Sequence, residues 1–128
     1  MDTGAWFAYV NASDPDHARV RKFFDHYQGR LVTSSYVFDE TVTLTQARLG
    51  HARALAVGGT LLDAAVVEWV HVGPADEKAA WDLFVKRPDK SYSFTDCTSF
   101  VLMRRRKIAK AVTLDEHFRQ EGFALLPD

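Results

Sequence analysis

The stretch LVTSSYVFDETVTLTQARLG, residues 31–50, joins a short strand-like run to a longer segment with a helix stop signal. Residues 31–34 are typical of a strand, and Ser35 is suited to be the N-cap of the segment that follows. In residues 36–49, apolar side chains alternate with threonines as they would in a strand, so periodicity alone leaves two interpretations open. We predict a helix because the run is long for a strand and ends at Gly50.

Outward from this stretch, short apolar runs alternate with amphipathic segments. Apolar side chains at helical spacing predict a helix from Pro15 to Tyr27, with Gly29 as its stop signal. The remaining patterns predict helices at 51–65, 75–87, 96–106 and around His117, and apolar strands at 66–72, 111–114 and 123–126. This order predicts an α/β domain with parallel strands, right-handed crossovers and helices on both faces of the sheet.

The length and composition indicate one globular domain covering residues 1–128. The chain has 16 Lys and Arg against 17 Asp and Glu, a net charge of −1, and 47% of its residues are hydrophobic. These values exclude a disordered chain, and the near-neutral charge argues against a generally basic nucleic-acid binder. Apolar runs are too short to span a membrane and the lone Cys97 cannot form an internal disulfide, so we expect a cytoplasmic protein.

Four carboxylates lie where predicted strands end or helices begin, at the edge where open α/β sheets bind their ligands. They are Asp2, Glu40, Asp96 and Asp115. Carboxylates gathered this closely raise one another's pKa and destabilise the fold unless a positive charge lies between them. Because Mg²⁺ and Mn²⁺ take oxygen ligands and are commonly held by one or two carboxylates, the pattern favours a divalent-cation site.

Each acid also has a purely structural interpretation. Asp96 and Asp115 are suited to cap helices, and Glu40 is suited to stabilise a helix dipole from the first turns. Asp2 would then be a solvated residue at the terminus. The joint pattern of the four acids favours the metal site over these separate explanations.

Other candidate chemistry is weaker. The histidines show no zinc-binding spacing, and Gly58-Gly59-Thr60 lacks the spacing of a phosphate-binding loop. Cys97 lies on an apolar helical face, where packing is its expected role. The basic run Arg104-Arg105-Arg106-Lys107 suits either an RNA contact or favourable cations at a helix C-terminus, and both interpretations stay open.

Several motifs carry a resemblance that spans nearly the whole chain. They are Met1-Asp2-Thr3-Gly4-Ala5-Trp6, Thr33-Ser34-Ser35-Tyr36-Val37 leading to Glu40, Ser93-Phe94-Thr95-Asp96-Cys97, Thr113-Leu114-Asp115 with Phe118, and the ending from Gly122-Phe123 to Pro127. In these motifs the chain resembles the PIN domain family, and within it the VapC-type ribonuclease toxins of toxin–antitoxin systems.

The resemblance implies a three-layer α/β/α sandwich around a central parallel sheet, with a Mg²⁺ or Mn²⁺ site that cleaves RNA. It implies catalytic roles for Asp2, Glu40, Asp96 and Asp115. Asp2 and Asp96 would be direct metal ligands, Asp115 would bind metal directly or through water, and Glu40 would hold a water or assist proton transfer. Thr3 and Thr95 would be supporting hydroxyls, and the products would carry 5′-phosphate and 3′-hydroxyl ends.

Two departures from the family pattern stand out. Relatives have several apolar residues before the first acid, which form a central strand, whereas only Met1 precedes Asp2 here. Without such a strand, Asp2 is expected to be poorly anchored. Where many relatives carry a further acid two residues after the fourth, this chain has His117, which weakens the expectation of a second, fully acidic metal site.

The resemblance also implies partners other than RNA. Toxins of this type are restrained by an antitoxin whose basic side chain enters the acidic pocket, and an arginine fork pairs well with carboxylates. The family commonly forms two-fold dimers. Trp6, Phe7, Phe23 and Tyr27 are expected to supply apolar surface for a homodimer.

Three alternatives to a toxin stay open. A phospho-accepting receiver domain also gathers acids and Mg²⁺ at strand ends, but it needs a lysine just after a late strand, where this chain has Asp115-Glu116-His117. A non-catalytic PIN-like scaffold would bind partners without metal. A housekeeping RNA-processing nuclease would cleave RNA without an antitoxin.

Overall fold

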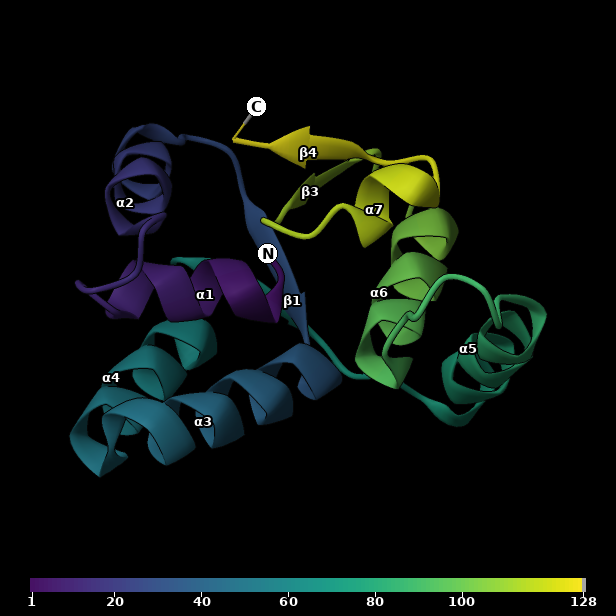
Figure 1. Cartoon of the computed structure of the whole chain (residues 1–128), viewed down its shortest axis with the longest axis horizontal. Coiled ribbons are helices and arrows are strands. Elements are labelled where there is room, and N and C mark those ends of the chain that lie inside the picture. Colours follow the sequence, from purple (N-terminus) through teal and green to yellow (C-terminus); the bar gives the residue numbers. More distant parts are fainter. Residues whose placement is uncertain (128) are drawn as a thin grey trace.

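Four short strands pair two by two in the computed structural model, which describes residues 1–127 (Figure 1). β1 (Leu31–Ser34) pairs in parallel with β2 (Val67–Val70), and β3 (Lys110–Val112) pairs in parallel with β4 (Ala124–Leu126). The α/β class and the parallel pairing predicted from the sequence are therefore confirmed.

The first two residues of the chain join the two strand pairs. The Met1 ammonium group donates a hydrogen bond of 2.8 Å to the Val32 carbonyl of β1, and the Asp2 N–H donates one of 2.8 Å to the Val112 carbonyl of β3. Met1 and Asp2 thus hold the place of a central strand at one end of the sheet. The expectation that Asp2 is poorly anchored is wrong, because its backbone is bonded to β3 and to the first helix.

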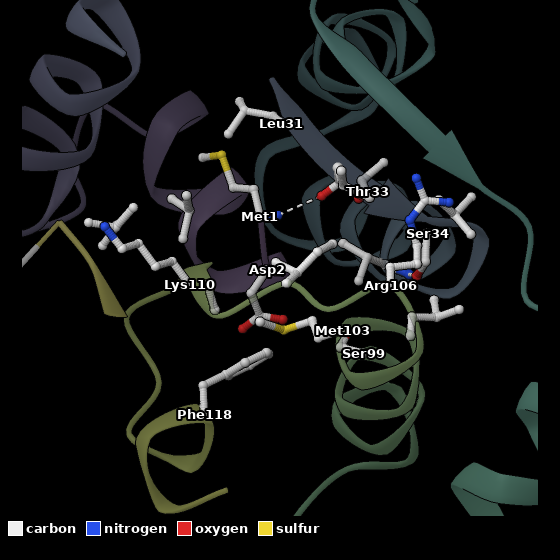
Figure 2. A pocket seen from close by; sticks show the side chains of 18 of the residues that line it. Met1, Asp2, Leu31, Thr33, Ser34, Ser99, Met103, Arg106, Lys110 and Phe118 are labelled. Carbon is white, nitrogen blue, oxygen red and sulfur yellow. Dashed lines mark hydrogen bonds between the residues drawn. The ribbon is translucent and has the colours of Figure 1, made fainter. Parts of the chain in front are cut away.

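A groove remains between β1 and β3 next to Met1 and Asp2. It encloses about 450 Å³ and is lined mainly by apolar side chains, among them Leu31, Met103 and Phe118 (Figure 2). One edge of β1 pairs with β2, and its other edge faces Met1. The backbone N–H and C=O groups on that second edge point into this groove. The predicted single sheet is therefore two parallel pairs with an open seam.

Helices flank the strands on both sides (Figure 1). Their bounds are α1 (Thr3–Val10), α2 (His17–His26), α3 (Ser35–Leu49), α4 (His51–Leu62), α5 (Pro74–Lys86), α6 (Phe94–Arg105) and α7 (His117–Gln120). α1, α3 and α4 lie beside β1, whereas α5, α6 and α7 lie on the side of β3 and β4. The predicted sandwich arrangement is confirmed.

Two core clusters lie mainly on these two sides, and a third, of Val70, Val72 and Leu102, joins them. One contains the fully buried Trp6 and Val57 with the strand residue Leu31, and the other contains the fully buried Phe100 with Phe118 and other aromatic side chains. We call the first side, with α1, α3, α4, β1 and β2, the N-terminal half. The second, with α5, α6, α7, β3 and β4, is the C-terminal half.

The helix predicted at residues 36–49 is confirmed as α3, but its predicted cap is wrong. The hydroxyl of Ser34 accepts a hydrogen bond of 3.1 Å from the Val37 N–H, so Ser34 is the N-cap. The hydroxyl of Ser35 instead accepts one of 2.9 Å from Val72 and ties α3 to the end of β2. Ser34 therefore caps α3, and the predicted cap Ser35 instead bonds to Val72.

Several predicted bounds also shift. α4 ends at Leu62 rather than at residue 65, because the Asp63 carboxylate accepts a hydrogen bond from the Ala65 N–H and closes a turn. β1 has the predicted bounds, and the other strands are shorter than predicted by one to three residues. α1 was not predicted from the apolar pattern, and it begins directly after Asp2.

The predicted apolar surface is wrong for Trp6, which is fully buried in the N-terminal core. Tyr27 is 38% exposed and stacks on Phe23. The largest exposed apolar side chains lie elsewhere, on α4 and α5: Leu55, Leu62, Trp81, Phe84 and Val85. Within residues 1–127, no helix has the length and apolar character needed to cross a membrane.

Candidate functional site

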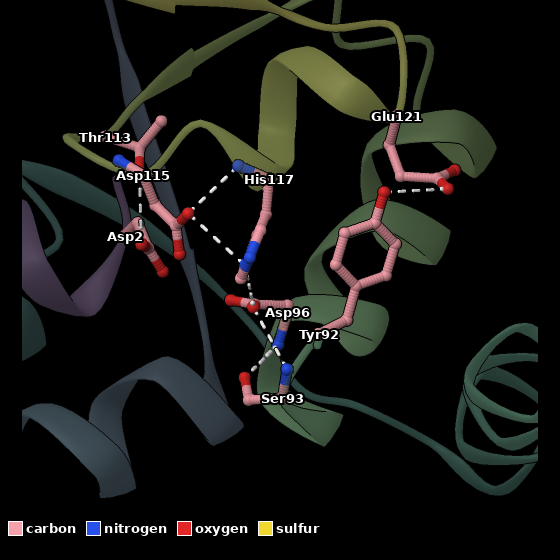
Figure 3. Close-up of polar contacts among 8 residues, drawn as sticks. All are labelled: Asp2, Tyr92, Ser93, Asp96, Thr113, Asp115, His117 and Glu121. Atoms are coloured by element: carbon pink, nitrogen blue, oxygen red, sulfur yellow. Dashed lines mark hydrogen bonds and ion pairs between the residues drawn. The ribbon is translucent and has the colours of Figure 1, made fainter. Parts of the chain in front are cut away.

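Asp96 is held at the beginning of α6 by a capping box. The Ser93 hydroxyl accepts a hydrogen bond of 3.0 Å from the Asp96 N–H, and the Asp96 carboxylate accepts one of 3.1 Å from the Ser93 N–H (Figure 3). The predicted capping interpretation of Asp96 is therefore correct in part, since Asp96 is the third helical residue and Ser93 is the cap. Burial raises the pKa of Asp96, and the bonds from Ser93 and His117 lower it by a smaller amount.

Asp115 lies in the turn between β3 and α7. Its N–H donates to the Thr113 hydroxyl at 3.0 Å, and its carboxylate accepts a hydrogen bond of 2.9 Å from the His117 N–H. The Asp115 side chain is 38% exposed, so one of its faces is open to solvent. Asp115 thus shapes the turn and also presents a carboxylate to the cavity.

The imidazole of His117 lies between two of the acids (Figure 3). Its Nδ1 is 3.3 Å from an Asp96 oxygen and 3.3 Å from an Asp115 oxygen. Its ring also packs edge-on against Tyr92, with the ring centroids 5.1 Å apart. Donor atoms of Asp96, Asp115 and His117 all lie within 4.8 Å of one another, which is a spacing that one metal ion can bridge.

Asp2 reaches the same cavity from the N-terminal half. Its carboxylate accepts a hydrogen bond of 3.1 Å from the Thr113 hydroxyl, the same hydroxyl that accepts the Asp115 N–H. Burial, and then the negative charge of Asp96, raise the pKa of Asp2 to about 7. In the absence of a cation, Asp2 therefore holds a proton up to neutral pH.

One cavity of about 550 Å³ contains all four predicted acids. Its lining includes Asp2, Glu40, Asp96, Asp115 and His117. Glu40 is half-buried on α3 and lines the cavity without belonging to the group of Asp96, Asp115 and His117. All four predicted acids therefore line one cavity, although Asp2 and Glu40 stand apart from the tight group of three.

The supporting hydroxyls differ from those predicted. Thr3 lines the cavity, and among the described residues its buried hydroxyl has no hydrogen-bond partner. Thr95 is not part of the cavity lining, and its carbonyl accepts a bond from Thr98. Ser93 and Thr113 also bond to the acids through their hydroxyls, and their place three and two residues before Asp96 and Asp115 is the signal that could have identified them.

The structure gives the other candidates structural roles. Arg104, Arg105 and Arg106 each pair with an acid, respectively Glu121, Asp76 and Glu68. These pairs neutralise the basic run and disfavour the RNA contact. Burial raises the pKa of the Cys97 thiol to about 11, so Cys97 is a packed core residue as predicted.

Comparison with known proteins gives a consistent result. Residues 1–123 match the PIN domain family model. The chain is 36% identical over 123 residues to the 23S rRNA-specific endonuclease VapC20 of Mycobacterium tuberculosis, covering 96% of this chain and 93% of the relative. It is 34% identical to the ribonuclease VapC26 of the same organism, over 92% of this chain and 87% of that relative.

The fold is also similar to a crystal structure. That of Mycobacterium tuberculosis VapC20, described as a sarcin-ricin loop cleaving toxin, superposes with a TM-score of 0.91 at 35% sequence identity. The match covers 96% of this chain and 94% of the solved one. This chain therefore shares the overall fold of that toxin over nearly its whole length.

Proposed function

The chain belongs to the PIN domain family, and from this premise we propose that it is a metal-dependent endoribonuclease and the toxin of a toxin–antitoxin pair. The observation that carries the proposal is the cavity in which carboxylates from both halves of the molecule converge. Such a convergence is costly to the fold unless a cation or a basic group lies among the acids.

The donor set fits a hard divalent cation. Asp96 and Asp115 supply oxygens next to one another, Asp2 lines the same cavity, and the Thr3 hydroxyl there is buried without a partner among residues 1–127. Mg²⁺ and Mn²⁺ both prefer such oxygen donors. A bound divalent cation supplies Lewis-acid activation of water and compensates charge at the phosphodiester.

The residues around this site have distinct tasks. We assign Asp2 and Asp96 to direct contact with the cation, and Asp115 to direct contact or contact through water. Glu40, which lies across the cavity, orients the attacking water or takes its proton. The Thr113 hydroxyl positions the Asp2 carboxylate by donating to it, which fixes the spacing between the acids of the two halves.

The substrate proposed is a single-stranded or looped region of RNA, cut to leave 5′-phosphate and 3′-hydroxyl ends. VapC20 is named for cleavage of 23S rRNA, which makes RNA of the translation machinery the first class to examine. Bases in loops are unstacked and can be read by a protein, whereas paired RNA is recognised mostly by shape. We place the activity in the cytoplasm, where this class of RNA is found.

We also propose that the chain forms a homodimer and is inhibited by a cognate antitoxin. An arginine from the antitoxin would pair with the carboxylates of the cavity and exclude both cation and phosphate. The exposed Trp81, Phe84 and Val85 on α5, or Leu55 and Leu62 on α4, offer apolar surface for a partner. Light scattering at micromolar concentration tests the dimer, and a strictly monomeric mass contradicts it.

The test of function is cleavage of RNA by the purified protein. We expect cleavage in Mg²⁺ or Mn²⁺, none with a chelator, and a loss of at least about a hundredfold in Asp96→Asn. Asp25→Asn, which changes an exposed acid on α2, an element with no residue in the cavity lining, is the matched control and keeps the parental rate. Metal-independent cleavage, or full activity of Asp96→Asn, contradicts the proposal.

Mapping of the new RNA ends sharpens the result. We expect one or a few sites with 5′-phosphate and 3′-hydroxyl ends after brief induction in cells. Randomly distributed ends contradict a specific target. A protein that binds no Mn²⁺ and cuts no RNA is instead a non-catalytic scaffold.

A further inference from the structure

The imidazole of His117 lies between the carboxylates of Asp96 and Asp115. We propose that His117 is a direct nitrogen ligand of the cation, and that it biases the site toward transition-metal ions such as Mn²⁺ over Mg²⁺. This inference rests on the proposed function, because it concerns the ligands of the same site. It assigns His117 a role in metal selectivity.

The first argument is geometric. Nδ1 of His117 carries at most one hydrogen, yet it lies 3.3 Å from both the Asp96 and the Asp115 oxygens, so it cannot donate well to both. Neighbouring ligands of an octahedral Mg²⁺ site lie about 2.9 Å apart, given bonds of about 2.0–2.1 Å. The two nitrogen–oxygen distances are therefore close to that spacing, and all three donor atoms lie within 4.8 Å of one another.

The second argument is that the ring is held in place from its own side of the cavity. The His117 backbone N–H is bonded to the Asp115 carboxylate, and the ring packs edge-on against the buried Tyr92. The His117 side chain is 26% exposed, so its ring is directed inward rather than into solvent. An inward-facing donor that is fixed by packing is what a metal site requires.

An independent feature of the cavity also indicates a ligand. Thr3 is only 5% exposed, lines the same cavity, and its hydroxyl has no hydrogen-bond partner in the described part of the chain. A buried hydroxyl without a partner is unfavourable unless it contacts a ligand or its water. Thr3 and His117 are thus both among the residues that line this cavity.

The third argument concerns the choice of metal. Imidazole nitrogen is a softer donor than a carboxylate and suits transition metals, whereas Mg²⁺ is bound almost entirely through oxygen. Replacing an acid by His117 also removes one negative charge from the set of ligands. The site therefore loses affinity for Mg²⁺ relative to Mn²⁺.

The direct test is pulsed electron paramagnetic resonance of the Mn²⁺-loaded protein labelled with ¹⁵N-histidine. We expect a hyperfine coupling typical of a directly bonded nitrogen in the parental protein, its loss in His117→Gln, and its retention in His71→Gln. His71 is exposed at the end of β2 and serves as the matched control. The parental spectrum alone decides the ligand, even if a variant fails to fold.

Competition between the metals completes the test. We expect His117→Asp to reduce the Mn²⁺-over-Mg²⁺ affinity ratio at least about tenfold. Bound Mn²⁺ without nitrogen coupling overturns the role of His117 and leaves the proposed nuclease intact. Failure of the parental protein to bind Mn²⁺ at all overturns the metal site itself, and the inference with it.

Discussion

The two halves of the molecule present their acids in different ways. In the C-terminal half, Asp96 and Asp115 are each fixed by short-range hydrogen bonds, from Ser93 and within the turn before α7. In the N-terminal half, Asp2 is fixed largely by Thr113, which belongs to the other half and lies 111 residues away in sequence. Glu40 stands on α3 and lines the same cavity.

The difference is one of sequence separation. The bonds that fix Asp96 and Asp115 join residues two or three positions apart. The Asp2 carboxylate reaches the cavity through contacts of Met1 and Asp2 with β1, β3 and Thr113. The proposed site therefore depends both on local turns and on the packing of the two halves.

The largest effect that separates the two halves is expected at Glu40. Glu40→Gln leaves Mn²⁺ affinity within about twofold but lowers RNA cleavage at least about a hundredfold, because it removes a proton acceptor and not a ligand. Calorimetry and a cleavage assay measure the two effects. Asp39→Asn, an exposed neighbour on the same helix, is the control. Equal losses of binding and cleavage would place Glu40 among the ligands.

The seam between the halves can be strengthened from the Met1 side. Burial lowers the pKa of the Met1 ammonium group to about 6, so a charge at this position is unfavourable. A variant with Leu-Val-Val-Val joined to Met1 replaces the ammonium group by an amide and lets an extended segment enter the apolar groove between β1 and β3.

We expect this extension to raise the free energy of unfolding by about 2 kcal/mol, from backbone hydrogen bonds and apolar burial. Urea denaturation measures it. An extension of Gly-Ser-Gly-Ser has the same length without apolar side chains. If both extensions behave alike, the groove does not accept a strand.

Thr113 connects the acids of the two halves through one hydroxyl. Thr113→Val keeps the shape of the side chain but removes the bonds to Asp2 and to the Asp115 N–H. We expect Mn²⁺ affinity to fall about tenfold, as is usual when a group that orients a ligand is lost. Thr113→Ser keeps the hydroxyl and should retain affinity. An unchanged affinity in Thr113→Val would mean that the halves are not coupled through this residue.

The smallest effect is a pH dependence of stability in the absence of metal. The pKa of Asp2 is raised to about 7 in the folded protein, so the folded state binds the proton more tightly than the unfolded state. Its contribution is complete below the unfolded pKa and is lost as the pH rises through about 7. Between pH 6 and pH 8, we expect the parental protein to lose about 1 kcal/mol relative to Asp2→Asn.

Thermal or urea unfolding of both proteins without metal measures this difference. The lowered pKa of Met1 acts in the opposite direction and is present in both proteins; because the charge of Asp2 raises that pKa, an acetylated N-terminus in both proteins removes the Met1 contribution. A difference that is flat with pH would show that Asp2 is already ionised at pH 6.

The sequence alone predicts much of the site because its acids lie next to strand ends and helix beginnings. Asp96 and Asp115 were identifiable in this way, and so was α3 despite its alternating pattern. What local sequence could not predict depends on contacts between distant residues. The burial of Trp6 and the Thr113 contact to Asp2 arise only when the two halves pack together.

The split between the strand pairs has the same origin. The apolar residues of each strand are enough to predict the strand itself. Which strands pair, and that β1 and β3 do not pair with each other, depends on the three-dimensional packing and not on local sequence. His117 shows a different limit. Its position two residues after Asp115 marked it as a departure from the acidic pattern, yet only the geometry shows its ring directed between two carboxylates.

The central claim is that the two halves share one divalent-cation site. The most direct test is calorimetric titration of Mn²⁺ into the parental protein, Asp2→Asn and Asp96→Asn under the same conditions. The account predicts that each replacement weakens binding at least about tenfold, although the two acids come from opposite halves. Parental affinity in Asp2→Asn, with binding lost only in Asp96→Asn, would assign the site to the C-terminal half alone and contradict the account.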